Sequence, residues 1–319
     1  MAKPILSTIT PTAYRALLSR ANGINRVIPI DATWVMPNVP RVPAKEFLEI
    51  ERIKNSAFFD LDKYCGDSPY PHMLPSQSVF NDAMNDLGLK STDSIVVYDT
   101  EGNFSSPRAA WTFSLFGHCQ VYLLDNYLNY KKSSFPLDTS KVESFRTPLS
   151  SEQTSNTPIP ESEFKAKYKE QVIEYEELLD LVETNQLSTN YLALDARSLG
   201  RFAGEADEPR KGLSSGHVPG TKNLPFPKVL ETTNKQYKSK QEILQIFAND
   251  LNIDFSNDEW KKQYPKGIIV MCGTGVSAVI LRFALTSILG LDVPVRVYDG
   301  SWTEWAQRAP KEFIVKGDD

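Results

Sequence analysis

The stretch Val270-Met271-Cys272-Gly273-Thr274-Gly275-Val276-Ser277-Ala278 decides the fold of this chain. The apolar run of residues 267–271 predicts a buried strand that ends at a cysteine. A glycine-bearing loop follows, and the apolar residues 276–289 predict a helix. We therefore expect Cys272 at the mouth of a strand–loop–helix turn, where backbone N–H groups and the positive end of the helix converge on the sulfur. Such surroundings favour the thiolate and make a cysteine nucleophilic.

A buried structural cysteine is the alternative, because free cysteines are among the most buried residues in proteins. The two glycines of the loop, Gly273 and Gly275, let the backbone wrap around the sulfur without Cβ clashes. The local pattern by itself leaves both interpretations open.

The rest of the chain contains a second copy of this organisation without the cysteine. In each half, short β-rich runs end in Asp, and a later run carries the loop. The runs of the first half are residues 27–31, 57–60, 95–99 and 121–126, and those of the second half are 191–195, 216–220, 268–272 and 295–302. A repeat of this length indicates a duplicated domain. Asp99 takes the position of Cys272, so the first half is expected to be catalytically silent.

At 319 residues the chain is long enough for two domains with separate cores. Strands that alternate with helical stretches predict α/β domains, each with a mostly parallel sheet flanked by helices. We expect an N-terminal domain at 1–145, a linker at 146–168 and a C-terminal catalytic domain at 169–319. The polar linker is rich in Ser, Thr, Pro and Glu, and its later part is alternatively a long loop draped over the domains.

The composition bears on the class of protein. The net charge of −5 argues against a protein that coats nucleic acid, although it does not exclude a local basic groove. Three cysteines without metal-ligand spacing fit a reducing compartment and predict no disulfide framework. No apolar run approaches the ~18 residues of a transmembrane helix.

The amino terminus allows two interpretations that are compatible with each other. Residues 1–30 carry Lys3, Arg15, Arg20 and Arg26 and no acidic residue, as mitochondrial transit peptides do. Alternatively, residues 12–20 form an ordinary first helix after Pro11.

Together these motifs resemble the tandem-domain rhodaneses and, within them, the 3-mercaptopyruvate sulfurtransferases. The matching segments are Gly-His-Val-Pro-Gly-Thr-Lys-Asn-Leu-Pro at 216–225, Asp-Gly-Ser-Trp-Thr-Glu-Trp at 299–305, the cysteine loop at 272–278, Phe-Phe-Asp-Leu-Asp at 58–62 and Pro-Tyr-Pro-His-Met-Leu-Pro at 69–75. The resemblance covers almost the whole chain. One departure is Arg52-Ile53-Lys54-Asn55, which stands where the subfamily often has His-Ile-Pro-Gly.

The resemblance implies a sulfurtransferase that moves sulfane sulfur from 3-mercaptopyruvate, and less well from thiosulfate, through a persulfide on Cys272. Backbone N–H groups of the persulfide loop, at Gly273, Gly275, Val276 and Ser277, would stabilise the charged persulfide as an oxyanion hole stabilises oxygen. We expect no cofactor and no metal. The alternative is a thiosulfate:cyanide sulfurtransferase of small-molecule sulfur metabolism.

The resemblance also implies that Arg201 and Arg210 hold the carboxylate and keto oxygen of mercaptopyruvate, since guanidinium groups bind carboxylates through paired hydrogen bonds. The alternative is surface ion pairing with Glu205, Asp207 and Glu208. Arg197 contacts substrate or, with Asp195, braces the active loop. Gly273 and Thr274 are uncharged where thiosulfate-preferring relatives carry basic residues, which favours mercaptopyruvate.

Three further residues match a proton-handling group proposed for the mercaptopyruvate enzymes: Thr274, His72 and Asp62. A hydroxyl–imidazole–carboxylate relay is reasonable chemistry for moving protons. A loop-stabilising role for His72 and a structural role for Asp62 are the alternatives.

A cysteine phosphatase shares the strand–loop–helix cysteine, but it needs an arginine six residues after the nucleophile. That position is Ala278, and Arg282 lies a turn farther on. The expected partners are a small sulfur donor and a thiol or protein-thiol acceptor, without direct contact to nucleic acid or membrane. We expect a monomer in the cytoplasm, the mitochondrion or both, feeding a sulfur relay such as tRNA thiolation.

Overall fold

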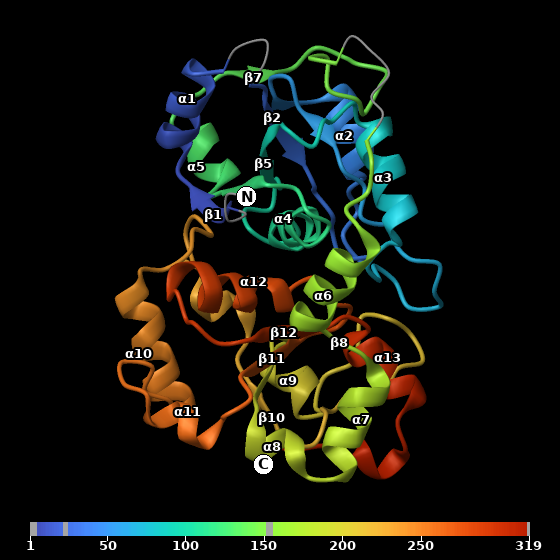
Figure 1. The fold of residues 1–319 in the computed structure, drawn as a ribbon, viewed down its shortest axis with the longest axis vertical. Helices are drawn as coiled ribbons and strands as arrows, with labels where there is room; N and C mark the ends of the chain where they lie inside the picture. Colours follow the sequence, from blue (N-terminus) through green and yellow to red (C-terminus); the bar gives the residue numbers. More distant parts are fainter. Residues whose placement is uncertain (1–4, 22–24, 151–155, 318–319) are drawn as a thin grey trace. The chain divides into compact units, whose positions relative to one another are not determined.

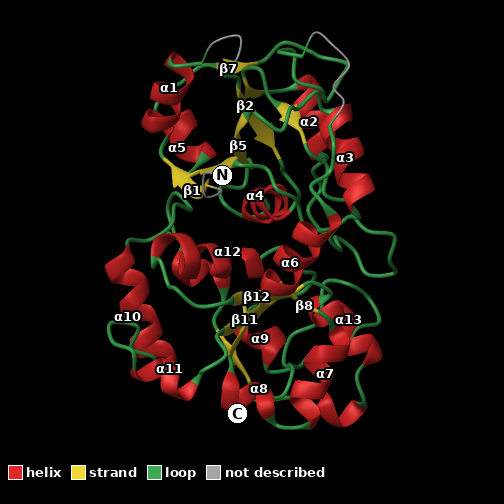
Figure 2. Cartoon of the chain, in the orientation of Figure 1, coloured by secondary structure: helices red, strands yellow, loops and turns green. Residues whose placement is uncertain are grey.

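The chain contains two sheets of parallel strands, and the strands of the two sheets follow an equivalent order. The computed structural model describes residues 5–21, 25–150 and 156–317, and these form two compact units (Figure 1). Within the described residues, unit 1 comprises 5–67, 74–166 and 233–236, and unit 2 comprises 68–73, 167–232 and 237–317. In each unit, helices flank the strands (Figure 2). The expected α/β class with parallel sheets flanked by helices is confirmed.

The sheet of unit 1 has the order β1-β6-β5-β2-β4, and its neighbouring strands are parallel. Its strands are β1 (Ile5–Ile9), β2 (Val27–Asp31), β4 (Ala57–Phe58), β5 (Ser94–Tyr98) and β6 (Gln120–Leu124), and β3 (Arg52–Ile53) pairs separately with β7 (Leu137–Asp138) in antiparallel fashion. The helices are α1 (Pro11–Ser19), α2 (Pro43–Glu49), α3 (Gln77–Asp86), α4 (Ser106–Leu115) and α5 (Tyr127–Lys132).

The sheet of unit 2 has the order β8-β12-β11-β9-β10, again with parallel neighbours. Its strands are β8 (Val172–Ile173), β9 (Leu192–Asp195), β10 (Thr221–Asn223), β11 (Ile268–Met271) and β12 (Val295–Tyr298). The helices are α7 (Tyr175–Glu183), α8 (Gln186–Asn190), α9 (Leu199–Phe202), η1 (Phe226–Val229), α10 (Lys240–Leu251), α11 (Glu259–Gln263), α12 (Ala278–Phe283), the π-helix η2 (Ala284–Ile288), α13 (Ser301–Arg308) and η3 (Lys311–Phe313). Helix α6 (Glu161–Gln171) begins in unit 1 and ends in unit 2.

The duplication is visible strand by strand. β5 lies between β2 and β6, as β11 lies between β9 and β12. Helix α4 follows β5 and packs on it, as α12 follows and packs on β11. All four residues of β11 are buried, as expected of a strand covered on both faces. Asp99 and Cys272 therefore follow equivalent strands.

Each unit contains a short segment from the other half of the sequence. Residues 68–73 belong to unit 2, and residues 233–236 belong to unit 1. His72 in the first segment has φ 63° and Lys235 in the second has φ 59°, both in the left-handed region. Each lies four residues before a helix N-cap, Ser76 for α3 and Ser239 for α10. The exchanged segments are thus equivalent positions of the repeat.

At the amino terminus, the expected helix is present as α1, which buries Tyr14 in the core of unit 1. The preceding strand β1 pairs with β6. After β7 the chain remains hydrogen-bonded to unit 1: Arg146 Nη1 donates to the Asn85 carbonyl (2.7 Å), and Asn156 Nδ2 donates to the Leu89 carbonyl (2.8 Å). Part of the expected linker, residues 151–155, lies outside the described residues.

The departure at Arg52-Ile53-Lys54-Asn55 is accommodated by the backbone. Asn55 takes φ 69°, in the left-handed region that Gly220 (φ 83°) takes at the equivalent turn of unit 2. Asparagine tolerates this region better than most residues with a Cβ, so the turn forms without its glycine.

Candidate active site

Cys272 directly follows β11, at the carboxyl end of the middle strand of the unit 2 sheet. The residue is 2 % exposed. Its N–H donates to Ser301 Oγ (3.1 Å), and its carbonyl accepts from the N–H of Trp302 (3.0 Å). The Gly273 carbonyl accepts from both the N–H and the Oγ1 of Thr303, at 2.9 and 2.7 Å. The start of α13 therefore fixes the main chain around the cysteine, which explains why the Asp-Gly-Ser-Trp-Thr stretch accompanies it.

The loop from Cys272 to Ser277 turns the chain from β11 into α12. Gly275 has φ 74°, a left-handed conformation that glycine adopts without Cβ strain. Thr274, Gly275 and Val276 are buried, whereas Gly273 and Ser277 are half-buried. The loop predicted from the sequence is thus a tight, enclosed turn rather than an open surface segment.

The equivalent loop of unit 1 holds a carboxylate in the position of the thiol. Asp99 Oδ2 accepts from the backbone N–H groups of Phe104, Ser105 and Ser106 at 2.9, 3.1 and 2.8 Å. Asp99 Oδ1 accepts from the N–H of Gly102 at 2.7 Å. A strand–loop–helix turn of this repeat therefore surrounds a negative charge with backbone donors.

Thr274 and His72 lie together, as the relay requires. His72 Nδ1 is 3.2 Å from Thr274 Oγ1, and both residues are buried. The left-handed backbone of His72 is uncommon for a residue with a side chain, and such conformations cluster at functional sites. Asp62, the third predicted member, lies in unit 1, where its exposed carboxylate accepts from Trp34 Nε1 (3.2 Å).

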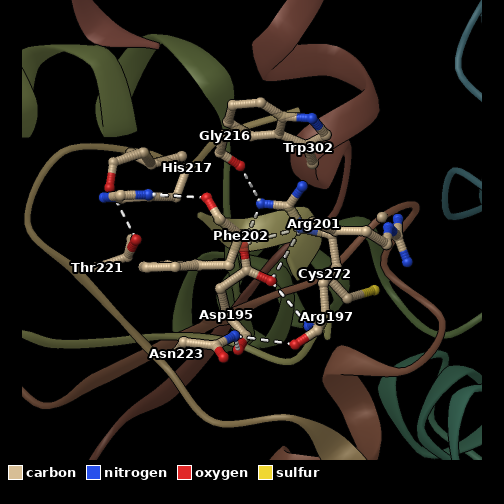
Figure 3. Close-up of polar contacts among 12 residues, drawn as sticks. Asp195, Arg197, Arg201, Phe202, Gly216, His217, Thr221, Asn223, Cys272 and Trp302 are labelled. Atoms are coloured by element: carbon tan, nitrogen blue, oxygen red, sulfur yellow. Dashed lines mark hydrogen bonds and ion pairs between the residues drawn. The ribbon is translucent and has the colours of Figure 1, made fainter. Parts of the chain in front are cut away.

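Arg197 is enclosed in unit 2, with a side chain that is 1 % exposed (Figure 3). Its Nε and Nη2 donate to the Asp195 carboxylate, its Nη1 donates to Glu208 (2.8 Å), and Nη2 also donates to the Gly216 carbonyl (2.7 Å). The guanidinium carbon lies 4.4 Å from the ring centroid of Trp302. This geometry favours the bracing role of Arg197 over direct contact with substrate.

Arg201 lies on α9 beside the cysteine loop. Its Nη2 would be 3.0 Å from a Cβ placed on Gly273, so the guanidinium occupies the space that a side chain at this position would need. Figure 3 shows the Arg201 and Cys272 side chains pointing to the same side of the Asp195–Arg197 pair. Arg201 also binds Glu208 through Nε (3.1 Å) and Nη2. Arg210, two residues after Glu208, is half-buried.

The motif at residues 216–225 supports α9 and the segment that precedes it. His217 Nδ1 donates to the Phe202 carbonyl (3.0 Å), and its ring stacks on Phe202 with centroids 3.8 Å apart (Figure 3). Asn223 Nδ2 donates to the carbonyls of Asp195 and Arg197, at 3.1 and 2.9 Å. The motif residues therefore hold the two segments that carry Arg197 and Arg201.

Sequence reasoning considered Glu208 only as a surface ion-pair partner. Its side chain is in fact 3 % exposed and lies between Arg197 and Arg201. Nothing in the local pattern signals this burial, because residues 203–212 after α9 form an irregular segment without periodicity. The anchoring role of Ser301 was likewise missed, although its place in the 299–305 motif was a signal.

Arg282 does not supply a phosphate-binding group. Its Nε donates to the Val295 carbonyl (3.3 Å) and its Nη2 to Gln171 Oε1 (2.8 Å), and the side chain is buried. All three cysteines are free thiols. Within residues 5–21, 25–150 and 156–317 there is no group of three or more His, Cys, Asp or Glu residues placed to hold a metal ion. The same residues include no helix long and apolar enough to span a membrane.

Comparisons with known proteins agree with this geometry. The rhodanese-like domain model matches residues 174–308. Thiosulfate sulfurtransferase TUM1 of Saccharomyces cerevisiae is 40 % identical over 99 % of this chain and 100 % of its own length. The crystal structure of the Tum1 protein has a TM-score of 0.85 at 39 % identity, covering 99 % of this chain and 100 % of that chain.

Two further relatives belong to the same group. The 3-mercaptopyruvate sulfurtransferase of Rattus norvegicus is 36 % identical over 90 % of this chain and 87 % of its own length. A sulfur transferase subunit of the yeast mitochondrial complex I superposes with a TM-score of 0.77 at 34 % identity, covering 98 % of this chain and 100 % of that chain. This chain therefore belongs to the rhodanese family and is a sulfurtransferase with two rhodanese-like units.

Proposed function

We propose that this sulfurtransferase takes sulfane sulfur from 3-mercaptopyruvate, carries it as a persulfide on Cys272 and passes it to a thiol acceptor. The observation that carries the proposal is the Asp99 loop of unit 1. Its backbone N–H groups hold a carboxylate where unit 2 has a cysteine. A persulfide anion on Cys272 needs the same surroundings, because in a water-excluded loop only fixed donors can stabilise its charge.

In the first half-reaction the Cys272 thiolate attacks the sulfur of mercaptopyruvate. The S–S bond forms as the carbon–sulfur bond breaks, and the electron pair leaves with the pyruvate enolate. The thiol proton of the donor is transferred to the enolate carbon, which yields pyruvate and a Cys272 persulfide anion. The Thr274–His72 pair would hold that proton in transit, and the hydrogen-bonding distance of 3.2 Å between Thr274 Oγ1 and His72 Nδ1 supports this role.

In the second half-reaction a thiolate or cyanide attacks the outer sulfur and restores the Cys272 thiolate. No electrons are gained or lost overall, so this chemistry is complete without an oxidant or a cofactor. Arg201 and Arg210 would together hold the carboxylate and keto oxygen of the donor. The uncharged residues Gly273 and Thr274 support mercaptopyruvate over thiosulfate, whereas the name of the TUM1 relative supports thiosulfate as the alternative donor.

The proposal also assigns different roles to the two domains. Residues 1–145 would form the catalytically silent domain, 146–168 a linker and 169–319 the catalytic domain. A monomer in the cytoplasm, the mitochondrion or both would feed a protein relay, such as one that serves tRNA thiolation. Support for this setting comes from the mitochondrial complex that includes one structural neighbour.

Mass spectrometry after treatment with mercaptopyruvate tests the proposal. We expect one added sulfur on the peptide that contains Cys272, loss of transfer in Cys272→Ser, and near-normal transfer in Cys65→Ser and Cys119→Ser. The ratio of kcat/KM for mercaptopyruvate and thiosulfate, measured with one acceptor, decides between the two donors. Sulfur added to Cys65 or Cys119 while Cys272 stays unmodified would overturn the assignment.

A further inference from the structure

The carboxylate of Glu208 is hydrogen-bonded to Arg201, the arginine that lies beside the cysteine loop. Glu208 Oε1 accepts from Arg197 Nη1 (2.8 Å) and from Arg201 Nε (3.1 Å), and its Oε2 accepts from Arg201 Nη2. Its side chain is 3 % exposed, so water does not screen its charge effectively. An anion that binds Arg201 therefore also experiences the negative charge of Glu208.

The charges of this cluster are balanced. Asp195 and Glu208 together carry two negative charges, and Arg197 and Arg201 carry two positive ones. Arg197 is enclosed, but the Arg201 side chain is 20 % exposed and lies beside the loop at Gly273. Arg201 is thus the member of the cluster that can receive a ligand, and its charge is already partly compensated.

Glu208 also fixes how Arg201 can be used. Because Nε and Nη2 both bind Glu208, the side-on edge of the guanidinium is occupied, and a ligand has to use the end-on edge that includes Nη1. An incoming anion approaches Nη1 while Glu208 remains in place. Such a site suits one carboxylate with a single negative charge better than a compact group with two.

We propose that Glu208 is a positioning and specificity residue, which makes the donor site select singly charged α-keto acid thiols over doubly charged inorganic donors. This inference rests on the proposed function, because it concerns the donor of the Cys272 persulfide. Glu208 touches neither donor sulfur nor thiol. It acts through the orientation and net charge of Arg201, so its effect should lie mainly in KM.

The decisive variant is Glu208→Gln, which keeps the size and one acceptor oxygen but removes the charge. A dianion gains more than a monoanion when a nearby negative charge is removed. We expect the ratio of kcat/KM for thiosulfate to kcat/KM for mercaptopyruvate to rise about tenfold, with most of the change in KM for thiosulfate. The matched control is Glu205→Gln, which removes the same charge from an exposed position in the same segment. Its ratio should equal that of the wild type.

Three results would separate the possible failures. If neither donor adds sulfur to Cys272 in the wild type, the proposed function itself is wrong. If the wild type accepts both donors and Glu208→Gln lowers both kcat/KM values by one factor, Glu208 is only structural and the selection is refuted. If Glu208→Gln does not fold, Glu208→Asp decides: it keeps the charge, so its donor ratio must stay within about threefold of the wild type, and a tenfold rise refutes the inference.

Discussion

The equivalent aspartates Asp31 and Asp195 have different neighbours in the two units. Asp195 ends β9 and is paired with Arg197, two residues on. Asp31 ends β2, and the residue two positions on is Thr33, whose N–H and Oγ1 donate to Asp31 Oδ1 at 3.0 and 2.5 Å. Burial raises the pKa of Asp31 to about 7, and the negative charge of Asp99 adds to the rise. Unit 1 thus retains the buried carboxyl group without its arginine.

Replacement of Asp31 by Asn should change how stability depends on pH. In the folded wild type the carboxyl group keeps its proton up to a pKa of about 7, whereas in the unfolded chain it loses the proton near its ordinary pKa of 3.8. Between these values the folded state holds more protons, so the free energy of unfolding falls as pH rises, by roughly 1.4 kcal/mol per pKa unit. Asp31→Asn removes this loss, because the amide oxygen still accepts from Thr33 and carries no charge.

Urea unfolding at pH 4.5 and at pH 8 measures the effect. We expect Asp31→Asn to be more stable than the wild type at pH 8, with the advantage shrinking toward pH 4.5. The exposed Asp82, on α3 of the same unit, provides the control: Asp82→Asn should not alter the pH profile. An advantage of Asp31→Asn that does not vary with pH would show that Asp31 is ionised throughout.

The strand–loop–helix element is used twice, with different occupants. In unit 1 the loop between β5 and α4 closes on the carboxylate of Asp99, and in unit 2 the loop between β11 and α12 surrounds Cys272. A carboxylate that accepts several backbone N–H groups stabilises its own loop. In the first unit the Asp99 carboxylate therefore occupies the backbone donors that a persulfide would need, and it stabilises the loop by itself.

Asp99→Asn should weaken this element without affecting catalysis. The amide nitrogen replaces one acceptor oxygen and faces backbone N–H donors, which should cost about 1–3 kcal/mol of unfolding free energy. We expect faster hydrogen exchange in the residues 99–115 and a lower urea midpoint, with kcat/KM for mercaptopyruvate unchanged. Asp82→Asn again serves as the exposed control. A tenfold fall in kcat/KM at wild-type stability would show that Asp99 takes part in the reaction.

The sequence predicts elements of this kind well, since they depend on local patterns. The apolar runs that end at Asp31, Asp99, Asp195 and Cys272 correspond to β2, β5, β9 and β11. Helix starts are less exact: the helix expected from Val276 begins at Ala278 and continues as a π-helix from Ala284. Gly and Pro are the usual sequence signals of a turn, and the turn at residues 52–55 has neither. The left-handed conformation of Asn55 therefore could not be predicted from the local sequence.

At the scale of the whole molecule, the unpredicted features are the contacts between distant segments. Residues 233–236 reach unit 1, where the carbonyl of Lys235 accepts from Asn103 Nδ2 (3.1 Å) and that of Asn234 accepts from Asn126 Nδ2 (2.6 Å). Residues 68–73 bring His72 to Thr274 in unit 2. No periodicity encodes such exchanges, because their hydrogen bonds join residues of loops that are about 100 positions or more apart in the sequence. The resemblance placed His72 in the site, but the residue pattern alone did not.

The net charge of the whole chain bears on where the sulfur goes next. With 40 acidic and 35 basic residues, the protein carries a net charge of −5, which argues against a chain that coats nucleic acid through its overall charge. Direct transfer to tRNA is therefore disfavoured, and a protein thiol is the expected acceptor. We predict that protein carrying labelled sulfur on Cys272 passes the label to the active cysteine of a single-domain rhodanese. It should pass none to tRNA when no other protein is present.

The measurement follows the label on denaturing gels, with the sulfur loaded from mercaptopyruvate. Cys272→Ser shows how much label moves without the persulfide, and Cys119→Ser, which removes an exposed thiol, should behave as the wild type does. Cyanide, a small nucleophile, measures how much of the loaded sulfur is reachable at all. Ready release to cyanide without any transfer to a protein thiol would contradict the relay, because the outer sulfur would then be open to small nucleophiles and closed to the thiol of a folded partner. The enzyme would in that case serve small-molecule sulfur metabolism, and the net negative charge of the chain would play no part in the choice of acceptor.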